Sequence, residues 1–209
     1  MDTRKTKHAV WWIIILCFYI SSCSGKYTKA IKIANTAGLK SAVLQTSKFN
    51  IQSFYRLTKR GGPLTIYIEG DGQGWLTRTQ PSMNPTPRNP LALRMAALDQ
   101  SQNVIYLARP CMYVDLRLEK LCRVPYWTHK RFAKIIILAI DEAINIVASR
   151  FKTKNIHLIG YSGGGAVVAM LAARRKDISS IRTVAGYMDH VALNRKVKVS
   201  PLIGSLDPI

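Results

Sequence analysis

Hydrophobic and polar positions follow one another in short blocks along most of this chain. Runs rich in β-branched and aromatic residues predict strands over residues 42–46, 50–57, 64–68, 103–108, 156–159 and 181–185. Longer periodic stretches between them predict helices over residues 91–98, 128–151 and 164–175. Asn89 is the expected N-cap of the first of these helices, and Pro90 its first residue. Strands that alternate with helices at this spacing imply βαβ units and a mainly parallel sheet covered on both faces.

The first 22 residues have a different pattern. Three basic residues precede an apolar run over residues 10–20, which is too short to be a comfortable permanent membrane anchor and predicts a secretory signal peptide. The run ends in Ile20–Cys23 (ISSC), which resembles the lipobox of bacterial lipoproteins. That resemblance implies a lipid on Cys23, with Ser24 after it similar to the pattern of lipoproteins sent to the outer membrane, facing the periplasm. An ordinary signal peptide that ends near a cysteine is the alternative.

The remaining chain is expected to form a polar linker over residues 23–40 and one domain over residues 41–209. A chain of 209 residues that is 48% hydrophobic fits a single domain with a sizeable core. The formal net charge is +20, but export argues against a nucleic-acid partner, and the Lys and Arg residues look scattered along the sequence. An anionic lipid surface as partner and a merely basic, soluble surface both stay open.

Cys111 and Cys122 lie in one loop-like stretch, and in an oxidising compartment they are expected to form a disulfide. Two reduced, buried thiols are the alternative. Neither a CxxC pair nor a His/Cys cluster suggests a metal site.

The stretch Gly160–Gly164 (GYSGG) follows a predicted strand and precedes a predicted helix of small residues. A nucleophilic serine needs a sharp strand-to-helix turn, and glycines two positions before and after it relieve the crowding there. Ser162 is therefore the predicted nucleophile of an acyl-transfer enzyme. A phosphate-binding turn or a plain tight turn is the alternative, although neither phosphate-loop pattern occurs at this turn.

Acyl transfer also requires hydrogen-bond donors for the oxyanion. The backbone N–H of Gly163 is expected to be one donor, and that of Asp71 or Gly72 the other, because residues 69–72 (EGDG) follow an earlier strand, as the oxyanion loop of esterases does. A simple glycine turn is the alternative for EGDG.

Five segments in this order resemble the α/β-hydrolases, more narrowly bacterial envelope hydrolase-like proteins: Ile68–Gly72 (IEGDG), Pro85–Pro90 (PTPRNP), Tyr106–Cys111 (YLARPC), Trp127–Phe132 (WTHKRF) and Gly160–Ala166 (GYSGGGA). The resemblance runs from about residue 42 onward. It implies an α/β-hydrolase-like three-layer sandwich with a mainly parallel sheet. It also implies a serine hydrolase of small-molecule acyl or lipid esters that needs no cofactor.

The catalytic acid and histidine follow the serine in this fold. The only histidine after Ser162 is His190, which comes early for that role and is more simply a polar loop residue. Asp189 is a candidate for the acid, with a structural role as its alternative. Family members continue with further strands, so the resemblance implies that the last strands are lacking and that the domain is incomplete at its C-terminus. A catalytically inactive or truncated α/β-hydrolase-like lipoprotein, with a binding role or no function, is the alternative to the enzyme.

Overall fold

The computed structural model describes residues 21–197 and 201–208. The predicted signal peptide lies outside these residues except for Ser21 and Ser22, and so does the side chain of Cys23; both predictions therefore stay predictions. None of the described helices is long and apolar enough to cross a bilayer.

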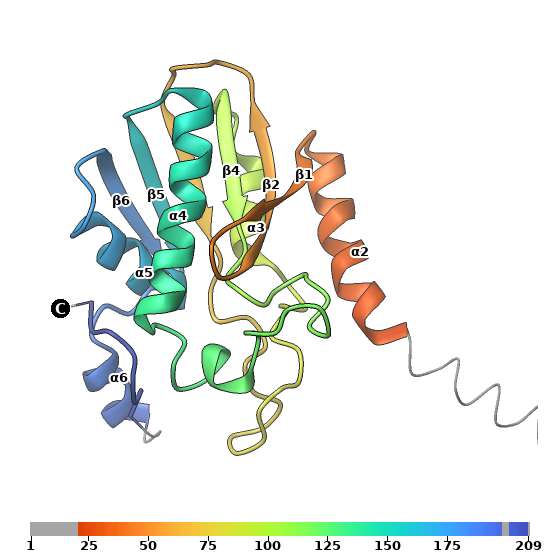
Figure 1. Cartoon of the computed structure of the whole chain (residues 1–209), viewed down its shortest axis with the longest axis vertical. Helices are drawn as coiled ribbons and strands as arrows, with labels where there is room; N and C mark the ends of the chain where they lie inside the picture. Colours follow the sequence, from red (N-terminus) through yellow and green to blue (C-terminus); the bar gives the residue numbers. More distant parts are fainter. Residues whose placement is uncertain (1–20, 198–200, 209) are drawn as a thin grey trace, which may run out of the picture.

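A six-stranded sheet forms the centre of the molecule (Figure 1). Its order is β1-β2-β4-β3-β5-β6, and β2 is antiparallel to both of its neighbours, whereas β4, β3, β5 and β6 are parallel. The strands are β1 (Lys40–Gln45), β2 (Asn50–Leu57), β3 (Leu64–Ile68), β4 (Asn103–Leu107), β5 (Ile156–Tyr161) and β6 (Ile178–Val184). All six predicted strands are confirmed, with ends that shift by up to three residues.

Helices cover both faces of the sheet, which gives the predicted three layers (Figure 1). Two helices, α4 (Lys134–Phe151) and α5 (Gly163–Ala172), bury their apolar residues against one face. On the other face, α2 (Ser21–Thr36) and α3 (Leu91–Leu98) form a second, smaller core. The mixed, mainly parallel α/β fold predicted from the sequence is therefore confirmed.

The predicted linker over residues 23–40 is wrong for most of its length, because α2 occupies it. Ala30 and Ala34 of this helix are fully buried in the core that α2 shares with α3. The polar composition of the segment hid a narrow apolar stripe at helical spacing, to which Tyr27 and Ile31 also belong.

The helix predicted over residues 128–151 is wrong at its start. A short 3₁₀-helix, η1 (Val124–Trp127), and a run of turns precede Lys134, where α4 begins. The Phe132 N–H donates to Ser205 Oγ at 3.2 Å, and the Phe132 carbonyl accepts from the Leu206 N–H at 2.9 Å. Because both backbone groups of Phe132 are hydrogen-bonded to this distant segment, the chain does not continue the helix there.

The last described elements are β6, at one edge of the sheet, and α6 (His190–Val197), which was not predicted. Ile181 and Val184 of β6 are each about two-fifths exposed. In the described part of the chain, β6 is therefore a partly exposed edge strand.

Candidate active site

Ser162 lies at the turn between β5 and α5, where the strand and helix predicted around it are confirmed. Its backbone has φ 50° and ψ −121°, a conformation that residues other than glycine rarely adopt. Two hydrogen bonds hold it: the Ser162 N–H donates to the Val184 carbonyl at 2.9 Å, and the Ser162 carbonyl accepts from the Gly165 N–H at 2.8 Å. The strained turn is thus fixed from the neighbouring strand and from the helix.

The two glycines that flank the serine are required by space. A Cβ atom at Gly160 would overlap the carbonyl oxygen of Gly164, and one at Gly164 would overlap the carbonyl oxygen of Ile68. The crowding that the sequence analysis attributes to this turn is therefore present, and it involves the end of β3 as well.

The loop after β3 crosses directly over the elbow. A Cβ atom at Gly70 would lie 3.2 Å from the Ser162 Cβ, and one at Gly163 would overlap the Asp71 carboxylate. Gly163 is the first residue of α5, so its N–H has no acceptor within the helix. The structure thus brings the Asp71 carboxylate against Gly163, and the loop that carries the backbone N–H groups of Asp71 and Gly72 beside Ser162. Their role as donors stays a prediction.

The Asp71 carboxylate is the centre of a partly buried ionic cluster, called here the Asp71 cluster. The Tyr187 hydroxyl donates to its Oδ2 at 2.7 Å, Arg131 Nε forms an ion pair with the same oxygen at 2.9 Å, and an Arg109 nitrogen lies 3.4 Å from Oδ1. Both guanidinium groups lie 5.3 Å from the centre of the Phe132 ring. These contacts hold the loop in place from β4, from the turn before α4 and from the segment after β6.

Burial opposes the charges of this cluster, and the ion pairs offset the burial. Arg109 is 4% exposed, and burial lowers its pKa despite the attraction of Asp71. Burial acts in the same direction on Arg131, but Asp71 and Tyr187 outweigh it and leave the pKa of Arg131 above its ordinary value. Burial and the charge of Asp71 raise the pKa of Tyr187, so its hydroxyl stays protonated. Two cations and one anion therefore lie beside the elbow.

The sequence alone predicts no role for Arg109, Arg131 or Tyr187. The first two lie within segments that carry the family resemblance, YLARPC and WTHKRF, so a signal was present without a function attached to it. Tyr187 lies outside all five segments that carry the resemblance. Three separate parts of the chain supply these side chains, and only the fold brings them to Asp71.

Glu69 opens the same loop and is 2% exposed. Its carboxylate accepts from the Gly70 N–H at 3.0 Å and from the Tyr106 hydroxyl at 3.2 Å, and the backbone N–H groups of Ala92 and Leu93 also donate to it. Burial raises the pKa of Glu69 from 4.5 to about 7, although these four hydrogen bonds act in the opposite direction. Glu69 is therefore only partly ionised near neutral pH.

The same contacts make Glu69 the cap of α3, so the predicted N-cap is wrong. The Asn89 side chain accepts from Arg94 Nε at 2.7 Å and makes no cap hydrogen bond, and Pro90 takes the N-cap position. A carboxylate from another part of the chain satisfies the N–H groups at the helix start instead. A cap of this kind is invisible to a local sequence pattern.

Ser162 opens into a wide cleft of about 1390 Å³. Its lining includes Glu69, Asp71 and Gly72, further residues of the loop between β3 and α3, and residues 201–203. Apolar and basic side chains make up much of the remaining lining: Trp75, Leu76, Arg78, Arg88, Trp127, His129, Arg131, Leu202 and Ile203. Such a lining suits a substrate that is partly apolar and partly anionic.

The structure gives Ser162 no histidine partner within the described residues. His190 Nε2 donates to the Leu206 carbonyl at 2.9 Å, and its ring stacks on Phe132. His157 pairs with a serine of β6, and His129 lines the cleft without a hydrogen bond to Ser162. His129 is thus the described histidine that shares the cleft with the serine.

Asp189 lies just before α6 and accepts the Ala192 N–H at 2.7 Å. This is an N-cap contact, which corresponds to the structural alternative for this residue. The described hydrogen bonds connect Asp189 neither to Ser162 nor to His190.

The predicted disulfide between Cys111 and Cys122 is present. It joins the end of β4 to the segment before η1, with 5.5 Å between the two Cα atoms. The loop it closes leads from Arg109 toward Arg131, two members of the Asp71 cluster.

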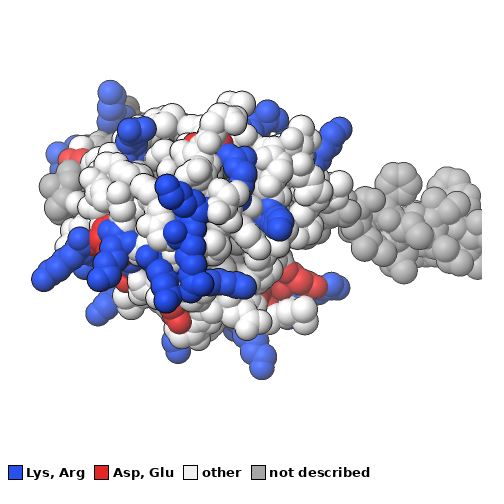
Figure 2. Space-filling model, turned by 90° about the horizontal axis from the view of Figure 1, so that it is seen from above, with Lys and Arg blue, Asp and Glu red and all other residues white. Residues whose placement is uncertain are grey.

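Some of the basic residues, which look scattered along the sequence, gather in space at one end of the molecule. Figure 2 views the end of the molecule opposite the cleft, where many Lys and Arg side chains gather. Backbone hydrogen bonds hold three segments together there, since Gly61 donates to Phe151, Leu64 to Asn155, and Ile156 to Asp177. We call this surface the basic end and define it by seven exposed cations: Lys59, Arg60, Arg150, Lys152, Lys154, Arg174 and Lys176.

No protein-family model and no curated protein matches this sequence. Among solved structures, a membrane phospholipase A, described as a novel bacterial virulence factor, is 15% identical with a TM-score of 0.50 over 97% of this chain and 60% of its own. A putative α/β hydrolase of unknown function from Agrobacterium tumefaciens is 14% identical with a TM-score of 0.52 over 70% of this chain and 60% of its own. In each case the match spans about three-fifths of the other protein's length. At these identities the likeness concerns the fold, and together with the strand order it shows that the chain has the α/β-hydrolase fold.

Proposed function

We propose that this protein is a serine hydrolase that acts on an ester or related acyl substrate through an acyl-enzyme on Ser162. The observation that carries the proposal is the backbone of Ser162, which is held at φ 50° between a strand and a helix and opens into the cleft. A strained backbone of this kind persists only where surrounding contacts over-determine it, and such strain clusters at functional sites.

In the proposed reaction the Ser162 oxygen attacks the carbonyl carbon of the ester, and the carbonyl oxygen becomes an oxyanion. The Gly163 N–H and the Asp71 or Gly72 N–H donate to that oxyanion, and the positive end of the α5 dipole adds to their effect. The C–O bond to the alcohol breaks, the alcohol leaves with the proton that the Ser162 hydroxyl gives up, and water then hydrolyses the acyl-enzyme, which releases the acid and restores the hydroxyl. This chemistry calls for no cofactor.

The cleft supports a small-molecule acyl or lipid ester as substrate. Tryptophan and aliphatic side chains suit an acyl chain, and the arginines suit an anionic group. The phospholipase with the same fold is consistent with a lipid ester, although the shared fold by itself does not fix a substrate.

We further propose that the protein is anchored by a lipid on Cys23 in the bacterial cell envelope, at the outer membrane facing the periplasm. The lipobox-like sequence supports the anchor, and the Cys111–Cys122 disulfide is consistent with an oxidising compartment. Palmitate labelling of the expressed protein tests the anchor: label is expected in the unaltered chain, and equal label in Cys23→Ala would refute it.

One observation favours a second function, an inactive hydrolase-like lipoprotein that binds acyl esters. Within the described residues no base is hydrogen-bonded to Ser162, and a serine without a base is an ordinary alcohol. Oxyanion donors and substrate binding alone leave at most residual catalysis.

Labelling by a fluorophosphonate, together with hydrolysis of a p-nitrophenyl ester, separates the two functions. The hydrolase predicts covalent label on Ser162, mapped by mass spectrometry, and loss of both label and hydrolysis in Ser162→Ala. Ser179→Ala, at an exposed serine of β6, is the matched control and keeps both. Folded protein that takes no label and turns over no ester would favour the binding function.

A further inference from the structure

We propose that the rim of the Ser162 cleft rests on an anionic phospholipid bilayer, the same membrane to which the N-terminus is attached. The cleft rim is defined here by Trp75, Leu76, Arg78, Arg88 and Ile203, all of which line the cleft. The inference rests on the proposed function for what the cleft does with a lipid ester, but the docking is a separate property and has its own test.

The apolar members of the cleft rim are unusually exposed. Trp75 is 46% exposed, Leu76 50% and Ile203 73%. A bridge from Trp75 to Pro81 and a hydrogen bond of 2.8 Å from the Leu76 N–H to the Gln80 carbonyl shape the loop that carries the first two. Single exposed apolar residues are ordinary, but a group of them around one cleft, with a tryptophan among them, is typical of contact with a membrane interface.

The charge of the cleft rim fits an anionic surface. Arg78 and Arg88 are both exposed there, whereas the two carboxylates that line the cleft lie inside it. Glu69 is buried, and Asp71 is neutralised by its ion pairs with arginines. Each basic residue close to a membrane of anionic lipids strengthens the attachment about fivefold.

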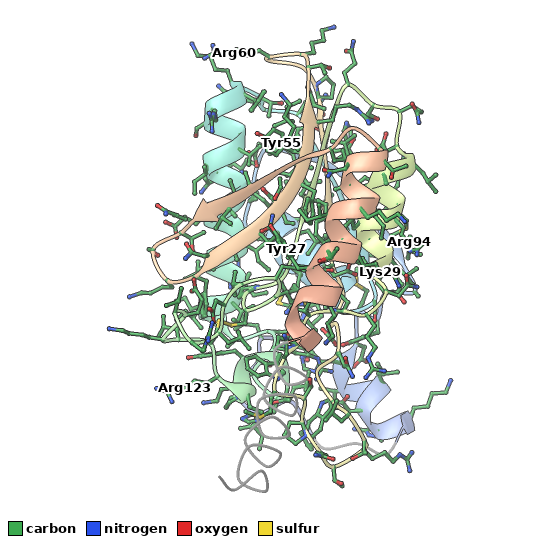
Figure 3. The ribbon with its side chains drawn as sticks, turned by 90° about the vertical axis from the view of Figure 1, so that its right-hand side faces the viewer. Tyr27, Lys29, Tyr55, Arg60, Arg94 and Arg123 are labelled. Atoms are coloured by element: carbon green, nitrogen blue, oxygen red, sulfur yellow. A yellow bond between two sulfur atoms is a disulfide. The ribbon has the colours of Figure 1, made fainter. Side chains whose placement is uncertain are left out.

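The start of α2 is bound to the loop that forms the cleft rim. Lys26 Nζ donates to Gln73 Oε1 at 3.0 Å and to the Thr86 carbonyl at 2.8 Å, and Lys29 Nζ donates to the Arg88 carbonyl at 2.9 Å. Figure 3 shows α2 from its outer side, with Tyr27 and Lys29 near the middle of the helix.

This contact decides which part of the protein meets the membrane. At 1.5 Å per residue, α2 rises only about 8 Å between Ser21 and Lys26. The apolar run over residues 10–20, or a lipid on Cys23, therefore joins the domain within about 8 Å, measured along the helix axis, of the lysine that binds this loop. Either form of attachment brings the cleft rim to the bilayer surface.

The basic end carries more charge than the cleft rim, but it lies too far away to compete. The 18 residues of α4 run from the Asp71 cluster to the basic end, a distance of about 27 Å. Salt screens charges over about 8 Å at physiological ionic strength. While α2 stays docked, the basic end is thus more than three screening lengths from the membrane at the cleft rim.

Quenching of tryptophan fluorescence by brominated lipids tests this orientation in the full chain. Trp11→Phe and Trp12→Phe together leave Trp75 and the buried Trp127 as the fluorophores. The protein is reconstituted in phosphatidylglycerol vesicles with brominated acyl chains, and strong quenching of Trp75 is expected. Adding Trp75→Phe leaves Trp127, which should show little quenching. Equal emission in brominated and plain vesicles before that last change would overturn the proposal.

Charge variants identify the surface that docks. Arg78→Gln with Arg88→Gln should lower the ratio of docked to undocked protein about 25-fold, at about fivefold per charge, on phosphatidylglycerol and hardly at all on phosphatidylcholine. Lys152→Gln with Lys154→Gln, at the basic end, is the matched control and should leave the quenching unchanged. The reverse result, with loss only in the lysine variant, would refute docking through the cleft rim.

Ser162→Ala separates this inference from the proposed function. Quenching of Trp75 in this variant should equal that in the protein with Ser162, since docking does not use the nucleophile. Docking without any ester hydrolysis in the unaltered chain would contradict the hydrolase and leave the membrane orientation standing. Ester hydrolysis without quenching of Trp75 would contradict the membrane orientation and leave the hydrolase standing.

Discussion

Glu69→Gln is expected to make the protein more stable at pH 8 and to leave its stability nearly unchanged at pH 4. The side chain is buried, so its ionised form carries a charge that is shielded from water. The four hydrogen-bond donors around the carboxylate compensate only part of this lost hydration. Glutamine has nearly the same shape and stays neutral at every pH.

The size of the effect follows from the pKa. Burial raises the pKa of Glu69 from 4.5 to about 7, so between these values the folded protein binds a proton that the unfolded chain has lost. Stability therefore falls as pH rises through this window, and the loss is complete above pH 7. The difference of about 2.5 pKa units corresponds to roughly 3 kcal/mol, at 1.36 kcal/mol per unit.

Urea unfolding at a series of pH values, followed by far-UV circular dichroism, measures this difference. With a urea m-value of about 2 kcal/mol/M, the midpoint of the glutamine variant should lie about 1.5 M above that of the glutamate protein at pH 8. At pH 4, below both pKa values, the two midpoints should nearly coincide. Parallel curves across the whole range would show that Glu69 ionises normally and that its burial has been misjudged.

Three further changes have defined outcomes in thermal or urea unfolding. Gly164→Ala should destabilise the protein by about 1–3 kcal/mol, because its Cβ would overlap a backbone carbonyl that has no freedom to move, and an unchanged midpoint would contradict the crowding at the elbow. Asp71→Asn should cost about 3 kcal/mol or more, because it leaves the buried Arg109 and the half-buried Arg131 without their anion, whereas Asp115→Asn, at an exposed ion pair, should have no measurable effect; equal effects would be inconsistent with the Asp71 cluster. Replacing Cys111 and Cys122 together by serine should cost about 3 kcal/mol for a loop of this length, and dithiothreitol should then no longer shift the midpoint.

The strands could be predicted from the sequence because their signal is local. Every residue of β4 is buried, and so is nearly all of β3; both strands are continuous apolar runs, as strands at the centre of a parallel sheet must be. The N-terminal helix α2 could not be predicted in the same way. Its buried face is a stripe of alanines and other apolar residues in a lysine-rich segment. This helix is stabilised by packing of the stripe against α3, a contact that the local sequence does not reveal.

In the candidate site, too, local features could be predicted from the sequence and non-local contacts could not. The elbow at Ser162 could be predicted, since one turn and its two glycines are written in five consecutive residues. The partners of Asp71 could not, because Arg109, Arg131 and Tyr187 come from the ends of three elements that meet only in the fold. For the same reason the sequence placed the cap of α3 on a neighbouring residue rather than on Glu69.

These non-local contacts also set the charge around the nucleophile. Arg109 and Arg131 carry two positive charges and Asp71 one negative charge, so the cluster has a net charge of +1 beside the start of α5. A positive charge there favours the oxyanion that the proposed reaction creates. Ionising Glu69, in the same loop, cancels part of this field, and its pKa of about 7 makes the cancellation pH-dependent. If Ser162 is the nucleophile, Glu69→Gln should therefore keep fluorophosphonate labelling faster than in the glutamate protein above pH 7, and equal rates at pH 8 would show that the field of the loop does not reach the serine.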